Sequence, residues 1–168
     1  MKLGGVSMRS KQIPSADTFL VRVAAEQKES ATKRLAAFGK VEDAGDAGGM
    51  VLRLGGRESA DPKSVWAKLQ EQAGKAEVDP ILFDETGEPH FPTGEVTVRF
   101  KESPSDAFLA GFAKRHGLKV RSRNAYVPAQ VAFQVTKRSY LPELIESLAP
   151  VENVVSAWAN TKSRYRRS

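Results

Sequence analysis

The sequence contains no cysteine and only two histidines, and none of its hydrophobic runs is long. Without cysteine, a disulfide framework, a thiolate nucleophile and a cysteine-ligated metal are all excluded. No stretch approaches the roughly 18 consecutive apolar residues of a membrane-spanning helix, and residues 1–15 lack the apolar segment of a secretory signal. These absences predict a soluble protein without a membrane partner, in a reducing compartment such as the cytoplasm.

Recognisable catalytic and metal-binding patterns are also missing. The motif G-x-S-x-G, the P-loop and the dinucleotide-binding motif G-x-G-x-x-G do not occur. His90 lies in a proline-flanked segment, His116 precedes Gly117, and no spacing of acidic residues resembles an oxygen-ligand metal site. We interpret both histidines as structural or solvated. The sequence therefore predicts a protein that is not an enzyme and holds neither cofactor nor metal.

Positive charge is concentrated at the two ends of the chain. The net charge is +6 at pH 7, yet residues 1–16 and 162–168 together supply +7 and the body, 17–161, carries −1. Within the body, residues 17–94 hold 10 basic and 14 acidic side chains, whereas residues 95–161 hold 9 and 6. Because the basicity is mostly terminal, a broad basic face is not indicated.

The sequence repeats itself at an offset of 76 to 78 residues. Residues 19–23 align with residues 96–100, and both segments alternate apolar and polar side chains as a half-buried strand does. Each segment also carries an arginine on one face, Arg22 in the first and Arg99 in the second. Such self-similarity predicts one structural unit present in two copies.

A helix is expected after each of these strands, and a second helix later in each half. The first helix stops at Gly39, and its counterpart begins at the capping residue Ser105 and stops at Gly117. The second pair of helices is expected to begin at Asp61, which precedes a proline, and at Ser139. The helical periodicity of both halves predicts that each helix faces a core.

Further extended segments complete each half: residues 40–43, 50–54 and 78–83 in the first, and residues 118–123, 131–135 and 154–159 in the second. The resulting order β-α-β-β-α-β predicts an α+β fold of two tandem ferredoxin-like units. Each unit would be a four-stranded antiparallel sheet with two helices on one face and a bare opposite face. The expected divisions are a flexible N-terminal segment 1–16, a first unit 17–84, a linker 85–94, a second unit 95–161 and a basic tail 162–168.

The bare sheet faces are the candidate binding surfaces. Alternation predicts that Arg22, Arg53, Arg99 and Gln134 point away from the helices and that the strand phenylalanines point inward. RNA-recognition domains use the same scaffold but stack bases on exposed aromatics of the first and third strands, which are absent here. A basic patch keeps nucleic-acid binding open as an alternative; its residues are Lys114, Arg115, Lys119, Arg121 and Arg123.

The second copy resembles the N-terminal prodomain of subtilisin-like serine proteases. The segments that carry the resemblance are 96–101, 114–120, 131–135, 144–148 and 151–160. The first copy shares it only through the internal repeat. The resemblance implies a folding chaperone and inhibitor whose bare sheet face packs on the protease and whose last segment lies in the active-site cleft.

Carried over by position, the sheet contacts would be Arg22, Arg53, Arg99 and Gln134. The cleft segment would run over residues 160–168, with Asn160, Tyr165, Arg166 and Arg167 as its principal contacts; a disordered, solubilising tail is the alternative. Because the family's catalytic blocks are absent, the resemblance implies a separately encoded serine protease as partner, met as inhibitor, chaperone or substrate. An RNA- or DNA-binding protein is the alternative, and a small-molecule sensor with its ligand between the two units is a third reading.

Overall fold

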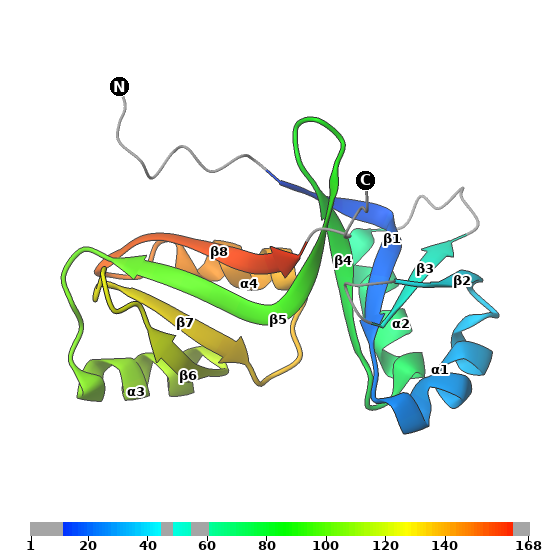
Figure 1. The fold of residues 1–168 in the computed structure, drawn as a ribbon, viewed down its shortest axis with the longest axis horizontal. Helices are drawn as coiled ribbons and strands as arrows, with labels where there is room; N and C mark the ends of the chain where they lie inside the picture. The colour runs from blue at the N-terminus through cyan, green and yellow to red at the C-terminus, as the bar shows by residue number, and fades with distance from the viewer. Residues whose placement is uncertain (1–11, 45–48, 55–60, 163–168) are drawn as a thin grey trace. The chain divides into compact units, whose positions relative to one another are not determined.

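The computed structural model describes residues 12–44, 49–54 and 61–162. Over these residues the protein is a mixed α+β fold of four α-helices, one 3-10 helix and eight strands, which confirms the predicted class (Figure 1). The first half contains β1 (Ile13–Arg22), η2 (Ala25–Gln27), α1 (Lys28–Leu35), β2 (Gly39–Asp43), β3 (Met50–Leu54), α2 (Pro62–Ala73) and β4 (Glu77–Phe83). The second contains β5 (Pro89–Phe100), α3 (Asp106–His116), β6 (Leu118–Arg123), β7 (Gln130–Val135), α4 (Leu141–Leu148) and β8 (Val154–Lys162). None of the described helices is long and apolar enough to cross a membrane.

The eight strands form an antiparallel arrangement in the order β2-β3-β1-β4-β5-β7-β6, with β8 paired to β5. One path therefore links all strands. Strand β5 makes this possible because it is long: Pro89 and His90 pair with β4, while residues 95–99 pair with β7. Inter-residue contacts nevertheless divide the chain into two compact units. The first unit comprises the residues up to Pro92 and those from Thr161 onward, and the second comprises Thr93–Asn160.

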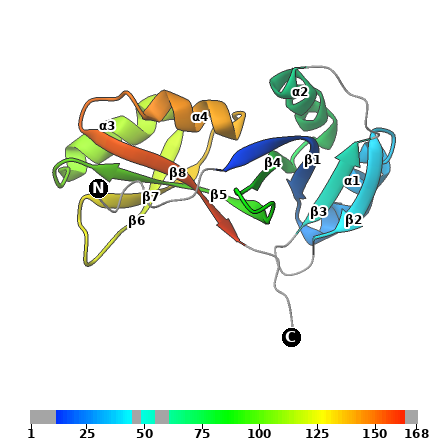
Figure 2. The same cartoon turned by 90° about the horizontal axis from the view of Figure 1, so that it is seen from above.

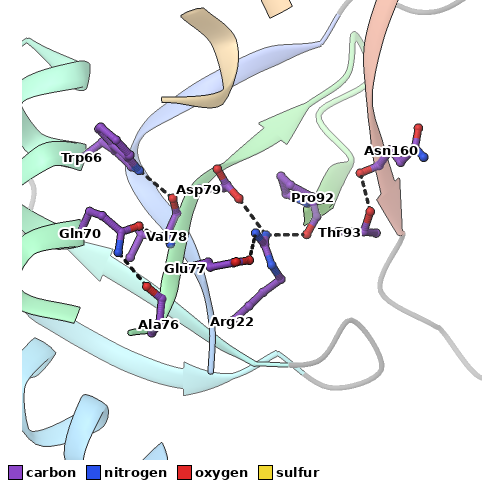
Figure 3. Close-up of polar contacts among 10 residues, drawn as sticks. All are labelled: Arg22, Trp66, Gln70, Ala76, Glu77, Val78, Asp79, Pro92, Thr93 and Asn160. Carbon is purple, nitrogen blue, oxygen red and sulfur yellow. Dashed lines mark hydrogen bonds and ion pairs between the residues drawn. The ribbon is translucent and has the colours of Figure 1, made fainter. Parts of the chain in front are cut away.

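In the first unit, α1 and α2 cover one side of the sheet (Figure 2). Alternate residues of β1 and β3 point toward them and are fully or almost fully buried, as are Leu35 of α1 and Leu69 of α2. Hydrogen bonds also link helix α2 to β4 and to the residue before it. Trp66 Nε1 donates to the Val78 carbonyl at 2.7 Å, and the Gln70 side-chain amide donates to the Ala76 carbonyl and accepts from the Val78 amide (Figure 3). This core is separate from the one in the second unit.

In the second unit, the core lies between the sheet and helices α3 and α4. Four phenylalanine rings pack there, with the Phe112 ring 5.3 Å from that of Phe100 and 5.4 Å from that of Phe133. Leu144 and Leu148 of α4 fill the same core from the other end. Because large aromatic and branched side chains from four strands and two helices meet here, this unit has a core of its own.

The structure differs from the predicted boundaries at two places. Strand β1 begins at Ile13, so residues 13–16 belong to a strand that pairs with β4 rather than to a flexible segment. Residues 89–94 of the predicted linker lie in β5, and Asp84–Glu88 form the turn of a β4-β5 hairpin. The prolines at 89 and 92 signalled a loop, yet Pro89 is the first residue of the strand and pairs with Phe83, a position at which proline is tolerated.

Candidate protein-docking surface

One side of the sheet in the second unit turns away from its helices. Val96, Val98 and Phe100 lie in the core, so the alternate residues of β5 point the other way. Residues that are paired across neighbouring strands point to the same side, which places residues of β7 and β6 on this side too. In β8, Ala157 and Ala159 pack against the core, so the residues that alternate with them point to the opposite side, away from the helices. We call this side the outer face; its side chains include Glu95, Thr97, Arg99, Lys119, Ser122, Gln130, Ala132, Gln134, Trp158 and Asn160.

A hydrogen-bond network joins β8 to β5 across the outer face. The Thr97 hydroxyl donates to Asn160 Oδ1 at 2.7 Å, and the Asn160 amide donates to Glu95 Oε1 at 3.4 Å. The main chain of Asn160 is bound as well, because the Thr93 hydroxyl donates to the Asn160 carbonyl at 3.3 Å (Figure 3). Arg121 of β6 reaches the other oxygen of Glu95 at 3.3 Å. Both Asn160 and Glu95 are therefore held in place.

Three of the predicted contact residues, Arg99, Gln134 and Asn160, share the outer face, although Arg99 lies opposite Gln130 and Gln134 lies opposite Glu95. Sequence reasoning missed Trp158, which shares this face and is half-buried. The alternation of side chains along β8 could have indicated the side on which Trp158 lies. That pattern is interrupted at the start of the strand, because Val154 and Ala157, three residues apart, both contact the core. The predicted contacts Tyr165, Arg166 and Arg167 lie outside the described residues.

The equivalent side of the first unit is different, because Arg22 is not available there as a free cation. Its guanidinium lies 2.8 Å from the Asp79 carboxylate and 2.7 Å from Glu77, and it also donates to the Pro92 carbonyl at 3.1 Å (Figure 3). Only 21% of its side chain is exposed. Arg22 thus links β1, β4 and the start of β5 within its own unit.

Burial and charge act in opposite directions on this cluster. Burial raises the pKa of Asp79 to about 6, because desolvation of the carboxylate outweighs the favourable field and hydrogen bond of Arg22. Burial alone would lower the pKa of Arg22, but the carboxylates of Asp79 and Glu77 raise it above its usual value. Arg22 therefore remains charged, whereas Asp79 changes its charge at mildly acidic pH.

The prediction of a bare sheet face is wrong for the first unit. Leu20, Val51, Ile81 and Phe91 form a second apolar cluster on the side opposite its helices, and each is almost fully buried. Arg53, also predicted as a contact residue, is half-exposed and lies 3.5 Å from the Glu42 carboxylate on the neighbouring strand. The alternation of polar and apolar residues predicted that Arg53 shares a side with Leu20 and Val51. It did not predict that Leu20 and Val51 are buried there.

An open hollow of about 520 Å³ lies beside the end of β1 and the start of β4, and its lining includes Arg22, Glu26, Lys75 and Glu77 but neither histidine nor serine. In the ranges that the structure describes, no group of three or more histidine or acidic side chains could hold a metal ion.

The two histidines lie in different surroundings. His90 lies 2.8 Å from Asp84 in the β4-β5 hairpin, and this hydrogen bond, followed by that from Thr86, holds the pKa of Asp84 well below its usual range. His116 ends α3 with its ring against Phe112, 4.7 Å between ring centres. Burial and the adjacent Arg115 lower the pKa of His116.

Comparison with protein-family models, with curated proteins and with solved structures gives no match.

Proposed function

We propose that this chain is a non-catalytic protein-binding module that docks a serine protease, encoded separately, through the outer face of the second unit. The observation that carries the proposal is the outer face itself. Arg99, Gln134, Trp158 and Asn160 share one side of one sheet, and Asn160 lies near the end of the strand that precedes the basic tail. Inhibitor, folding chaperone and substrate are the three roles that such docking allows.

The strand orders support a tandem ferredoxin-like interpretation of the fold. In the first half the order is β2-β3-β1-β4, and in the second it is β8-β5-β7-β6. Each is the order expected when two β-α-β units interleave to form one antiparallel sheet with both helices on one side. Under this interpretation the second half has the architecture that its resemblance to subtilase prodomains implies.

The chemistry of the outer face suits a protein partner. Tryptophan and arginine are the residue types that most often dominate protein interfaces, and both occur here beside the neutral polar groups Gln134 and Gln130. The Thr97–Asn160 hydrogen bond holds the end of β8 against β5, so less side-chain entropy is lost on docking. A pre-ordered mixture of apolar and polar groups of this kind fits a folded partner surface.

The tail extends this surface in the proposal. Strand β8 ends at Lys162, and the residues beyond it include the predicted cleft contacts Tyr165, Arg166 and Arg167. An extended segment can bind a protease cleft through backbone hydrogen bonds, with alternate side chains entering pockets. Basic side chains there would favour a trypsin-like specificity if the chain is cleaved as a substrate.

The test is to titrate a subtilisin-type and a trypsin-type protease with the purified chain, measuring residual activity on a small substrate and complex formation by size-exclusion chromatography. We expect a complex with one of them, and we expect Trp158→Ala or Arg99→Ala to weaken it at least tenfold, as for truncation of an interface anchor. Lys63→Ala, on the exposed start of α2 in the first unit, is the control. Undiminished activity and no complex with either enzyme would refute docking, and cleavage after Arg164, Arg166 or Arg167 would identify a substrate.

A nucleic-acid-binding function is the second candidate, and Trp158 favours it. With Lys119 and Arg99 on the same face, Trp158 offers one aromatic ring beside positive charge, the combination used to bind single strands. Binding to single-stranded oligonucleotides that falls steeply with added salt, and that is lost on deleting residues 162–168, would support this function over protease docking.

A further inference from the structure

The second unit concentrates its positive charge in one part of its sequence. Residues 107–142, which hold most of α3 together with β6 and β7, contain seven lysines and arginines and no acidic residue. The acidic residues Asp106 and Glu143 lie directly before and after this stretch. The net charge of −1 over the body of the chain therefore conceals a local excess of positive charge.

Most of these cations have no carboxylate beside them. Arg121 lies 3.3 Å from Glu95, and Arg123 lies 3.7 Å from Asp106. Four other cations are exposed and make no ion pair with any residue that the structure describes. We call these four the basic end; they are Lys114, Arg115, Lys119 and Lys137. Their field extends into the solvent by about a Debye length, ~10 Å at moderate salt.

Backbone contacts gather the basic end around one turn. Gly117 follows directly after α3, and its carbonyl accepts hydrogen bonds from the Thr136 amide at 2.9 Å and the Lys137 amide at 3.2 Å. Lys119 is two residues beyond Gly117 and pairs with Gln134. Residues from the end of α3, the start of β6 and the end of β7 therefore form one local cluster.

The helix dipole explains only part of this cluster. Lys114 and Arg115 lie in the last turn of α3, where cations are favoured by the carbonyl end of a helix. Lys119 and Lys137 lie outside the helix, so the dipole does not account for them. The excess charge also acts on its neighbours, because Arg115 adds to the effect of burial in lowering the pKa of His116.

The basic end lies at the end of the sheet where Asn160 is bound. The Asn160 amide donates to Glu95 at 3.4 Å, Glu95 pairs with Gln134, and Gln134 pairs in turn with Lys119. Lys119 itself belongs to the outer face. A partner that docks on the outer face and covers Asn160 therefore also meets the basic end.

We propose that the protease docked on the outer face presents an acidic surface to the basic end, and that this complementary charge steers the two proteins together. The inference rests on the proposed docking function. A folded acidic surface fits better than a nucleic-acid backbone, because the Glu95 carboxylate is held at the same end of the face by Arg121 and Asn160. A chain of phosphates would be repelled there, whereas a protein can place a hydrogen-bond donor opposite Glu95.

The association kinetics of the full chain with the protease that forms the complex test the inference. The association rate constant should fall steeply with added salt. Lys114→Glu combined with Lys137→Glu should lower it roughly tenfold at low salt and leave the dissociation rate nearly unchanged. Lys33→Glu combined with Lys68→Glu is the matched control, because both lysines are exposed on helices of the first unit and the net charge changes equally. This control should slow association by less than about twofold.

A neutral pair separates charge from folding. Lys114→Gln combined with Lys137→Gln should slow association in the same direction but by less than the glutamates do. Equal slowing by the control pair, or an association rate that does not depend on salt, would overturn the inference and leave the docking intact. The absence of a complex with either protease type would refute the docking itself, and the inference with it. Oligonucleotide binding that is lost in the Lys114→Glu and Lys137→Glu variant, without any protease complex, would assign the basic end to nucleic acid instead.

Discussion

Asp79 is a buried acidic side chain on β4 whose counter-charge comes from the neighbouring strand. Leu20 lies opposite Asp79 in the ladder, so Arg22, two residues further on, extends over the same side and reaches both Asp79 and Glu77. An ionised carboxylate in this position loses most of its hydration, which the ion pair only partly offsets. The cluster is thus a site where charge and burial compete, and its protonation should affect stability.

The stability of the first unit should depend on the charge of Asp79 between about pH 4 and pH 6. The pKa of Asp79 is about 6 in the folded chain and near 3.8 when unfolded, so folding favours the protonated form. Its contribution is therefore fully present below the unfolded value and is lost as pH rises through the folded value, by up to roughly 3 kcal/mol. Urea unfolding followed by Trp66 fluorescence, in a Trp158→Phe background, should show this slope in the parent and not after Asp79→Asn. An identical pH slope in both proteins would contradict the assignment to Asp79.

Gly117 is required by the turn that ends α3. Its φ is +70°, and a β-carbon added there would lie 2.7 Å from Cβ of Lys137. Gly117→Ala should therefore destabilise the second unit by about 1–3 kcal/mol. Gly111→Ala, in the exposed interior of the same helix with nothing within 4 Å of the added carbon, should instead stabilise it by about 0.5–1 kcal/mol. Opposite signs in thermal or urea unfolding are the expected result; equal effects would show that Gly117 is not conformationally required.

At the scale of the elements, the two helix starts predicted in the second half have different caps. The Ser105 hydroxyl accepts a hydrogen bond from the Phe108 amide at 3.1 Å and caps α3 as predicted. Ser139 does not cap α4: that helix begins after Tyr140, with Pro142 in its first turn, and the Ser139 hydroxyl donates to the Lys137 carbonyl. Serine followed by apolar periodicity was therefore a correct signal once and a wrong one once.

The two serines make a matched pair of variants. Ser105→Ala should cost about 1 kcal/mol of unfolding free energy, because an amide of the first turn loses its partner. Ser139→Ala should change the unfolding free energy by less than about 0.5 kcal/mol, since it removes only an exposed local hydrogen bond. Circular dichroism during urea unfolding measures both, and a larger loss from Ser139→Ala would mean that α4 depends on it after all.

Periodicity predicted most elements because the apolar and polar pattern of each one lies within its own residues. Strands β3 and β6 have the predicted bounds, and β4 and β7 begin one residue earlier than predicted. What periodicity missed depends on partners distant in the sequence. The start of β1 is stabilised by pairing with Leu82 and Phe83, and the start of β5 pairs with the same residues of β4. In the candidate site, the ion pairs of Arg22 likewise depend on residues 55 to 57 positions away.

At the scale of the whole molecule, each unit has an apolar core beneath its own helices, and these two cores share no residue. One includes Leu35 and Leu69, and the other includes Phe133 and Leu148. Each unit also contains one of the two tryptophans, Trp66 in the first and Trp158 in the second. The sequence therefore provides a separate fluorescent reporter for each core, which allows the stability of the two units to be measured in the same chain.

Separate cores predict separate responses to a core truncation. Leu148 is fully buried, so Leu148→Ala should lower the free energy of unfolding reported by Trp158 by about 2–5 kcal/mol. In the same variant the unfolding reported by Trp66 should change by less than about 0.5 kcal/mol, as for distant sites without shared partners. Leu35→Ala, equally buried in the first core, is the reciprocal control and should give the opposite pattern. Trp66→Phe and Trp158→Phe backgrounds isolate the two signals. If either truncation moves both transitions by the same amount, the continuous strand β5 makes the chain fold as one cooperative unit, and the duplication seen in the sequence would not extend to its stability.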